Sequence, residues 1–366
     1  MIEIRMLNKE QLLRFINDPE FHSMKILPIS RHRALSHIQN PRLNDDDILL
    51  LMAFKDKELV GYSGVLPDKV YLTGQPEKCG WLSCLWIDPK ERGAGIARML
   101  LEKAFEQWEN RILVTEFTES AKRLYDKMNV FNDLQINKGI RLYLRSDLQT
   151  LLPPKKEFFG KIVPLLKVLD VITNLFFDIR FLFWRKKITA SNYEFVKYID
   201  QEIEHFIADK QQNQLFKRRA AELNWIIKNP WVLSAPKQDK ESQKYHFSST
   251  DKSFDFYALK VRNKDNRLVA FMLFSKRNNR LKLPYCYYEP DHFKTVVEVI
   301  QSHLIQWSIS TFTTFHRELV QHLKEHKTPA LLKREIKRHY LISKFFNVPE
   351  KVSFEIQDGD ADCIFT

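Results

Sequence analysis

The chain has 366 residues, of which 44% are hydrophobic and 28% charged, and this composition is typical of a globular protein with a large core. Nine glycines and the lack of any low-complexity tract argue against a fibrous or disordered chain. The net charge is +12, and nearly all of the surplus follows residue 150, since residues 1–150 carry 22 basic and 21 acidic side chains. The length indicates two or three domains.

The cysteines and the first residues bear on the compartment. Cys79, Cys84, Cys286 and Cys363 stand alone, without the paired spacing of a zinc ribbon or a disulfide framework. Isolated cysteines are typical of reduced thiols in a cytoplasmic protein. The chain opens on a strand-like run and lacks the basic and apolar regions of a secretion signal, so we expect a cytoplasmic location.

The first 150 residues predict a mixed succession of strands and helices. Apolar runs and alternating patterns indicate strands, whereas apolar residues spaced at three and four indicate amphipathic helices. Strands are expected at 2–7, 48–54, 59–65, 69–72, 80–87, 111–116 and 140–144, and helices at 9–17, 30–39, 94–108 and 119–128. Pro153 and Pro154 can continue neither element, which places a domain boundary there.

The order of elements recurs beyond this boundary. Residues 38–41 and 227–230 both read Ile-x-Asn-Pro at the end of a predicted helix. Residues 87–89 and 288–290 both bring a strand through an acidic residue to a proline. Because these landmarks keep one order and similar spacing, they favour an internal duplication.

The most informative segment leads from a strand through a glycine turn into an amphipathic helix. It reads Leu85-Trp86-Ile87-Asp88-Pro89-Lys90-Glu91-Arg92-Gly93-Ala94-Gly95-Ile96-Ala97. Backbone N–H groups at a helix start lack intrahelical partners and lie at the positive end of the helix dipole, so they attract anions. Gly93 and Gly95 permit a phosphate to approach closely, and Arg92 adds a positive charge. Neither a Walker loop nor a dinucleotide fingerprint fits the spacing, and the turn predicts a pyrophosphate ligand, with a ligand-free tight turn as the alternative.

This turn carries a family resemblance. Residues 92–97 resemble the R-x-x-G-x-G/A motif of the GNAT N-acetyltransferase superfamily, and the element order of residues 1–148 is similar to that fold. The resemblance implies an α/β protein (an α+β mixed sheet) with two GNAT-like lobes, each a mixed, mostly antiparallel sheet flanked by helices. It also implies that the loop holds the pyrophosphate of coenzyme A, and that the backbone of Leu85, Trp86 and Ile87 bonds the pantetheine arm. The cosubstrate would be acetyl-CoA or another acyl-CoA.

A second family landmark suggests the catalytic residues. Residues 120–130 resemble the family's A-x-x-L-Y-E-K-x-G-F, and Tyr125 matches the tyrosine often used to protonate the departing thiolate. Many members place a glutamate base on the strand before the loop, and this chain has no carboxylate there. Glu116, at the end of the next strand, is the expected substitute, with Ser83 or Cys84 as groups that could hold a water. A packing role for Tyr125 and a merely solvated Glu116 are the structural alternatives.

The second half lacks the glycine turn. Residues 288–294 read Tyr-Glu-Pro-Asp-His-Phe-Lys, so this copy should not bind coenzyme A in the same way. By resemblance it is the degenerate half of a tandem GNAT protein, whose aromatic pairs at 224–225 and 230–231 either line an acceptor pocket or belong to the core. The expected domains are an acyl-CoA-binding GNAT domain at 1–150, a basic apolar helical linker at 151–190 and a degenerate GNAT-like domain at 191–366.

Two further features of the second half invite other interpretations. His322-Leu323-Lys324-Glu325-His326 fits the zinc-protease pattern H-x-x-E-H, but no third ligand is evident and we expect no metal. Residues 155–187 are rich in phenylalanine, leucine and basic residues, and charges interrupt them before they reach a spanning length. They predict helices packed between the lobes, with peripheral contact at an anionic membrane surface as the alternative. We expect no nucleic acid partner, because the basic surplus is dispersed.

These observations predict an acyl-CoA-dependent N-acyltransferase that passes an acyl group directly to a primary amine of a small molecule. Similarity to tandem GNAT proteins of surface-polysaccharide pathways points to an amino sugar as acceptor. The rival enzyme is a Fem-like transferase that uses aminoacyl-tRNA, which the net charge of +12 would suit. A non-catalytic acyl-CoA-binding protein is the other alternative, because the strand before the loop lacks a carboxylate.

Overall fold

The structure, a computed structural model, describes residues 1–185, 192–235, 240–349 and 354–365. Its contacts separate two compact units, each assembled from separate parts of the chain. Unit 1 comprises Met1–Asn137, Tyr198–Asp255 and Arg338–Thr366, and unit 2 comprises Lys138–Lys197 and Phe256–Lys337. The domains expected at 1–150, 151–190 and 191–366 are continuous in sequence, whereas each of the two units combines separate segments. The domain boundaries therefore stay a prediction.

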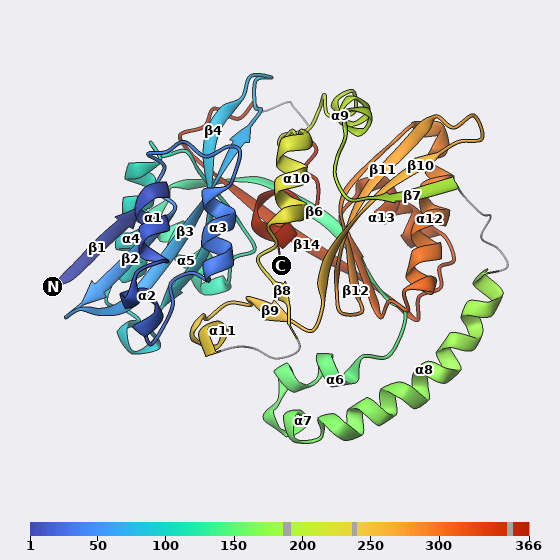
Figure 1. The fold of residues 1–366 in the computed structure, drawn as a ribbon, viewed down its shortest axis with the longest axis horizontal. Coiled ribbons are helices and arrows are strands. Elements are labelled where there is room, and N and C mark those ends of the chain that lie inside the picture. Colours follow the sequence, from blue (N-terminus) through green and yellow to red (C-terminus); the bar gives the residue numbers. More distant parts are fainter. Residues whose placement is uncertain (186–191, 236–239, 350–353, 366) are drawn as a thin grey trace. The chain divides into compact units, whose positions relative to one another are not determined.

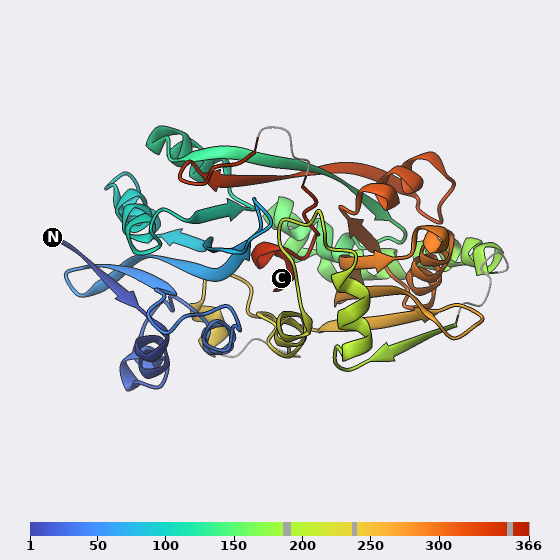
Figure 2. The same ribbon diagram turned by 90° about the horizontal axis from the view of Figure 1, so that it is seen from above.

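Unit 1 is built on a mixed, mostly antiparallel sheet. Its strands are β1 (Ile2–Leu7), β2 (Leu50–Lys55), β3 (Glu58–Val70), β4 (Glu77–Ile87), β5 (Ile112–Thr115) and parts of β6 (Phe131–Tyr143) and β14 (Leu332–Ser343). The sheet order is β1-β2-β3-β4-β5-β14-β6, in which β1 to β4 pair antiparallel and β5 runs parallel to β4. A strand from the end of the chain therefore lies between β5 and β6 (Figure 2, where β14 is red).

Alternation along the strands of unit 1 produces two cores, one on each face of the sheet. Leu50, Met52 and Phe54 pack with the first three helices, whereas Leu51 and Ala53 pack with the next two. These helices are α1 (Lys9–Phe15), α2 (Pro19–Ser23) and α3 (Arg31–Ile38) on one face and α4 (Ile96–Gln107) and α5 (Glu119–Met128) on the other (Figure 1). Further elements of the unit are η1 (Pro89–Glu91), α9 (Gln201–Ala208), α10 (Ala220–Lys228), β8 (Leu233–Ser234), α11 (Lys240–Lys244), β9 (Thr250–Asp251) and η4 (Ala361–Phe365).

Local chemistry explains where the predicted elements hold and where they differ. Asp56 and Lys57 adopt φ of 50° and 69°, the conformation of a two-residue hairpin turn, so β2 and β3 form a hairpin. The strands expected at 59–65 and 69–72 are one strand, β3. β6 begins at Phe131 instead of residue 140, because its polar first half is stabilised by pairing with β14 instead of by apolar burial.

Unit 2 repeats the same order of elements. Its sheet runs β14-β6-β13-β12-β11-β10-β7, with β12 parallel to β13 and antiparallel to β11. The additional strands are β7 (Asn192–Val196), β10 (Phe254–Arg262), β11 (Leu268–Arg277), β12 (Arg280–Tyr288) and β13 (Thr311–Thr314). The helices are α6 (Leu148–Leu151), η2 (Pro153–Lys155), α7 (Glu157–Lys161), α8 (Val163–Arg185), η3 (Pro290–His292), α12 (Phe293–Gln306) and α13 (Arg317–Glu325). In both units three strands precede a helix, a strand, a helix and a strand, whereas the sequence predicts four strands before that helix, because it divides β3 into two.

Candidate functional site

The glycine turn opens onto a helix start with no cap. Gly93 and Gly95 adopt φ of +91° and +78°, a region that glycine occupies without a steric penalty. α4 then begins at Ile96 with no side-chain cap and no acidic residue in its first turn. A Cβ built on either glycine would meet no atom within 4 Å, so the turn faces open space. With the exposed Arg92 and Ala94 beside it, this helix start can receive an anion.

The strand before the turn carries a β-bulge. The β3–β4 register passes from Tyr62 opposite Trp86 to Gly64 opposite Ser83, so β4 has one extra residue there. Cys84 takes up the irregularity with a left-handed φ of 54°. Because a bulge leaves an extra residue outside the ladder, its backbone groups can bond a ligand.

The other predicted loop residues divide between the two cores. Leu85 and Ile87 pack on the core that contains α4, and Ile96 is 1% exposed at the centre of that core. Trp86 faces the opposite core and stacks on Tyr62 with ring centres 5.3 Å apart. Ala97 is half-buried in the first turn of α4. The side chains of Leu85, Trp86 and Ile87 are therefore engaged in packing, and the role of their backbone toward a pantetheine arm stays a prediction.

Tyr125 lies on α5, in the same core as α4. It is 4% exposed and packs edge to face on Phe117 and Phe131, at 5.8 and 5.3 Å between ring centres. α5 begins at a Thr118 cap and ends at Asn129 with a left-handed φ of 54°. Burial raises the pKa of Tyr125 well above its usual range, so the phenol stays protonated and able to donate.

Glu116 follows β5 and is engaged in an ion pair. Its carboxylate accepts a hydrogen bond from Nε of Arg338 at 2.7 Å, and its side chain is 56% exposed. Arg338 is buried and also donates to the carbonyl of Asp358 at 3.0 Å. Any proton accepted by Glu116 would therefore compete with this ion pair.

A buried arginine contacts the bulge from the side of α3. Arg33 is 2% exposed, and its guanidinium donates to the Ser83 hydroxyl at 2.8 Å and to the Tyr245 hydroxyl at 2.5 Å. It also donates to the sulfur of Cys84, and its central carbon lies 4.0 Å from the ring centre of Trp231. A fixed positive charge thus lies directly behind the bulged strand.

The end of the chain brings a carboxylate to the same bulge. The Ser83 hydroxyl donates to Oδ2 of Asp362 at 2.5 Å, although the two residues are 279 positions apart. Asp362 belongs to η4, in which Phe365 stacks on Trp231 with ring centres 4.5 Å apart. Burial raises the pKa of Asp362, although the Ser83 hydrogen bond and the Arg33 charge oppose this shift. A half-buried carboxylate with a raised pKa is suited to accept a proton.

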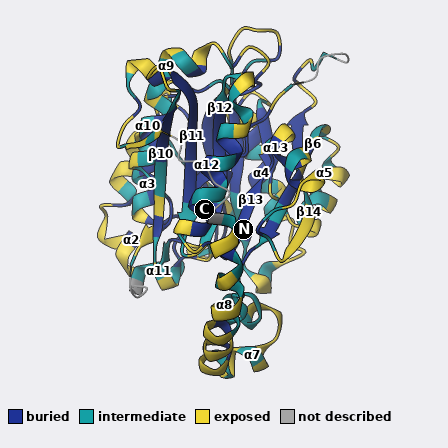
Figure 3. Ribbon diagram, turned by 90° about the vertical axis from the view of Figure 1, so that its right-hand side faces the viewer, coloured by how far each residue is buried: buried dark blue, intermediate teal, exposed yellow. Residues whose placement is uncertain are grey.

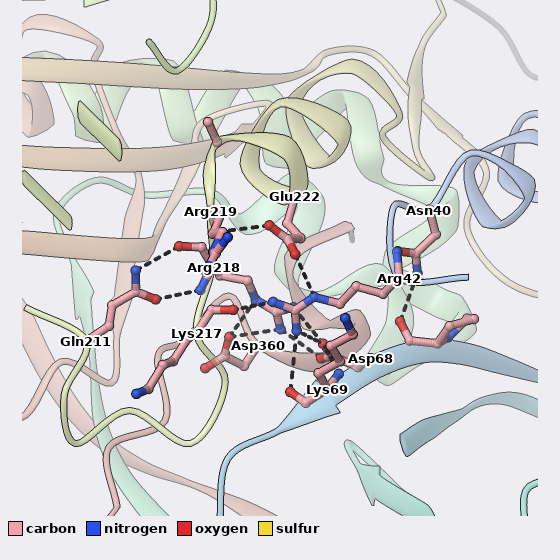
Figure 4. Close-up of polar contacts among 12 residues, drawn as sticks. Asn40, Arg42, Asp68, Lys69, Gln211, Lys217, Arg218, Arg219, Glu222 and Asp360 are labelled. Atoms are coloured by element: carbon pink, nitrogen blue, oxygen red, sulfur yellow. Dashed lines mark hydrogen bonds and ion pairs between the residues drawn. The ribbon is translucent and has the colours of Figure 1, made fainter. Parts of the chain in front are cut away.

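A buried ion-pair network holds this last segment beside β3 (Figure 4). Asp68 accepts two hydrogen bonds from Arg218, at 2.8 and 2.9 Å, and Arg42 donates to the same carboxylate. Arg218 also donates to Asp360 at 3.1 and 3.2 Å, and Arg42 donates to Glu222 at 2.9 Å. Because Asp360 lies two residues before Asp362, the network fixes the segment that carries the carboxylate.

The remaining candidates of the second half have other surroundings. His322 and His326 stack with ring centres 4.1 Å apart, and within the described ranges no three His, Cys, Asp or Glu side chains gather as a metal site would require. Trp225 and Trp231 are buried and donate to the backbone oxygen and the hydroxyl of Ser36, at 2.8 and 3.0 Å. Both tryptophans therefore lie in the core of unit 1.

Comparison with known families agrees with this geometry. The model of the acetyltransferase (GNAT) family matches residues 12–129, a range that includes the bulged strand, the glycine turn, α4 and Tyr125. By this match, residues 12–129 resemble the GNAT acetyltransferase family. This match places a GNAT-type domain in the part of the chain that carries the glycine turn. No protein of curated function matches the chain by sequence.

Solved structures share the GNAT fold at low sequence identity. A probable N-acyltransferase of unknown function from Enterococcus faecalis is 12% identical, with a TM-score of 0.51 over 93% of this chain and 72% of that chain. The N-myristoyltransferase of Saccharomyces cerevisiae, with bound myristoyl-CoA and inhibitors, is 11% identical, with a TM-score of 0.51 over 97% and 84%. A tandem GNAT protein from clavulanic acid biosynthesis is 11% identical, with a TM-score of 0.47 over 94% and 98%. The expected fold class is confirmed.

Some of the predicted site residues lie in one core of the GNAT domain, and others do not. Leu85, Ile87 and Tyr125 share one core with α4, whereas Glu116 is bonded to Arg338. Sequence reasoning missed Arg33 and Asp362 as site residues. Arg33 had a usable signal, since an arginine on the buried face of an amphipathic helix needs polar partners. Asp362 had none, because its contact with Ser83 depends on long-range folding.

Proposed function

We propose that the protein transfers an acyl group, acetyl first, from an acyl-CoA directly to a primary amine of a small molecule. The observation that carries this proposal is the uncapped start of α4 behind Gly93 and Gly95, next to a bulged strand. Residues 92–97 would hold the pyrophosphate, and the backbone of residues 85–87 would bond the pantetheine arm. The myristoyl-CoA bound to the yeast N-myristoyltransferase supports an acyl-CoA as the cosubstrate class.

The proposed reaction needs one proton acceptor and one proton donor. The neutral amine attacks the thioester carbonyl, a C–N bond forms, the C–S bond breaks and the amine nitrogen loses a proton. Tyr125 donates its proton to the departing thiolate, since burial keeps the phenol protonated. Asp362 is the proposed acceptor, directly or through Ser83 and a water, and Glu116 is the second candidate.

Two observations favour Asp362 over Glu116 as the acceptor. Its hydrogen bond to Ser83 places the Asp362 carboxylate at the bulge, where the resemblance puts the pantetheine arm. The Glu116 carboxylate is instead more than half exposed and engaged by Arg338. An amino sugar is the first acceptor to test.

Binding calorimetry with acetyl-CoA and free coenzyme A, at physiological salt, tests the cosubstrate. Wild type and Arg98→Ala should bind both, because Arg98 is an exposed arginine of the same helix that is paired with Glu102 at 2.8 Å. Arg92→Ala should bind roughly tenfold more weakly, since one charge-assisted contact is lost. If wild type binds neither ligand, the turn is structural and the aminoacyl-tRNA-dependent alternative moves to the front.

Release of free thiol from acetyl-CoA, with a panel of primary amines that includes amino sugars, tests the reaction. Tyr125→Phe should slow this release roughly a hundredfold while acetyl-CoA still binds. Tyr285→Phe, a buried tyrosine of unit 2, is the control. Tight binding without thiol release from any amine would favour the acyl-CoA-binding protein instead.

A further inference from the structure

Helix α8 directs several of its polar side chains toward the protein. Asp170 is 3% exposed and accepts hydrogen bonds from the Ser146 hydroxyl at 2.6 Å and from the N–H groups of Leu148 and Gln149 at 2.8 and 3.0 Å. It thereby caps the start of α6. Asn174 bonds both backbone groups of Ser146, at 2.8 and 2.9 Å.

The same polar stripe continues along the helix. Asp178 accepts a hydrogen bond from Arg145 at 2.6 Å, and Arg180 donates to the carbonyl of Leu144. Asp170, Asn174 and Asp178 are four residues apart and so lie on one face of α8. Because this stripe is bonded to residues 144–149, the polar contacts decide which face of α8 turns outward.

The face turned outward is apolar. Figure 3 shows most of α8 in the colour of exposed residues. Its large apolar side chains that are 40–69% exposed are Leu165, Val168, Leu169, Val171, Ile172, Leu175, Phe176, Ile179, Leu182 and Phe183. In α7, Phe158 is 62% exposed. Monomeric proteins rarely expose a contiguous apolar patch above roughly 300–600 Å². An apolar face with this many exposed side chains therefore indicates a surface that binds a partner.

We propose that this α7–α8 face (Phe158 and the α8 residues named above) docks on an anionic lipid surface. Lys155, Lys156, Lys161 and Lys167 lie in or next to these helices along the chain and are exposed. The acids that are not buried among the described side chains of 155–184 are Glu157, which is exposed, and Asp178, which is partly exposed and paired with Arg145. Cations beside an exposed apolar helix face attract anionic headgroups while the apolar side chains enter the acyl boundary. None of the helices in the described part of the chain combines the length and the apolar composition that crossing a bilayer requires.

The composition of the face favours lipid over a second copy of the chain. Helix pairing uses a narrow apolar seam whose flanking positions carry charges that choose the partner. On α8 the exposed apolar side chains include Leu169 and Val171, which are only two positions apart, so the apolar face is wider than such a seam. This inference does not rest on the proposed acyl transfer.

Co-sedimentation of the full chain with phosphatidylcholine vesicles, with and without phosphatidylserine, tests the proposal. Wild type should partition onto the vesicles that contain phosphatidylserine roughly tenfold more strongly, and added salt should weaken this binding. Leu175→Glu with Phe176→Glu should lose roughly tenfold in partition. Phe345→Glu is the control, because Phe345 is 55% exposed outside the face.

Two results would overturn the proposal. The first is failure of wild type to sediment with either vesicle. The second is a concentration-dependent dimer, measured by sedimentation velocity without lipid, that the double substitution abolishes, which would make a second copy the occupant. Circular dichroism melting checks that the variants fold. If the double variant is unfolded, Lys155→Glu with Lys156→Glu decides, because it should reduce binding to phosphatidylserine vesicles while leaving the apolar face intact.

Discussion

The strand–helix unit that forms the candidate site occurs once in each compact unit, and the two copies differ at the turn. In unit 1, four residues with Gly93 and Gly95 at positive φ separate η1 from α4. In unit 2, η3 ends at His292 and α12 begins at Phe293, so no turn intervenes. The second copy therefore has no loop in which an anion could reach the helix start.

The strands before the two helices share a bulge but differ in its chemistry. β12 pairs Tyr285 with Leu273 and Lys282 with Ser275, which leaves an extra residue in the strand, as in β4. The bulge of β12 contains Pro284, which has no N–H group to offer, whereas that of β4 contains Cys84. A duplicated fold can thus keep its scaffold in both copies while the binding chemistry depends on a few residues in one.

Removal of the buried carboxylate of unit 1 should have the largest effect on stability. Asp68→Asn leaves the guanidinium groups of Arg42 and Arg218 without their shared counter-charge, so we expect the free energy of unfolding to fall by about 3–5 kcal/mol in urea titrations at pH 7. Asp45→Asn is the control, because its pair with Lys9 is exposed and should change stability by less than about 1 kcal/mol. Equal small effects would show that the network does not hold unit 1 together.

The same network predicts a pH dependence. Burial alone would raise the pKa of Asp68, but Arg218 and Arg42 outweigh it and hold this pKa well below its usual range. A depressed folded-state pKa gives stability that is present above the unfolded value, near pH 4, and is lost as the pH falls below it. Wild type should therefore lose more stability between pH 5 and pH 3 than Asp68→Asn does.

Substitution of each candidate carboxylate shows which one accepts the proton of the amine. Asp362→Asn should lower the turnover of acetyl-CoA roughly ten- to a hundredfold, whereas Glu116→Gln should lower it little. Since the pKa of Asp362 is raised, the proton-accepting form is present above that pKa and is lost as the pH falls through it. The acid limb of the pH–rate profile should therefore disappear in Asp362→Asn. If the acid limb were lost only in Glu116→Gln, Glu116 would be the base instead of Asp362.

The parts of this site that were predicted are those with local causes. The glycine turn, the helix after it and α5 at 119–128 follow from residues that are neighbours in sequence. The parts that were missed depend on distant pairing: the polar first half of β6 is a strand only because β14 lies beside it. Ser83 likewise meets Asp362 only after the end of the chain has folded onto unit 1. The outward face of α8 could not be predicted either, because a helix that is apolar nearly all round gives no sign of which side contacts the protein.

Alanine substitutions of two glycines should have the smallest effects, and comparing them distinguishes backbone strain from loss of ligand binding. Gly95 and Gly74 adopt φ of +78° and +86°, and a Cβ at either would meet no atom within 4 Å. Alanine at each position should therefore cost a similar roughly 1–2 kcal/mol of folding stability, measured by urea unfolding. Only Gly95→Ala should also weaken acetyl-CoA binding, roughly tenfold by calorimetry, since its methyl group would occupy the space in front of the α4 start. If both variants bound acetyl-CoA as wild type does, the open side of the turn would not be where the pyrophosphate lies, and the difference between the two strand–helix units would be one of loop length alone.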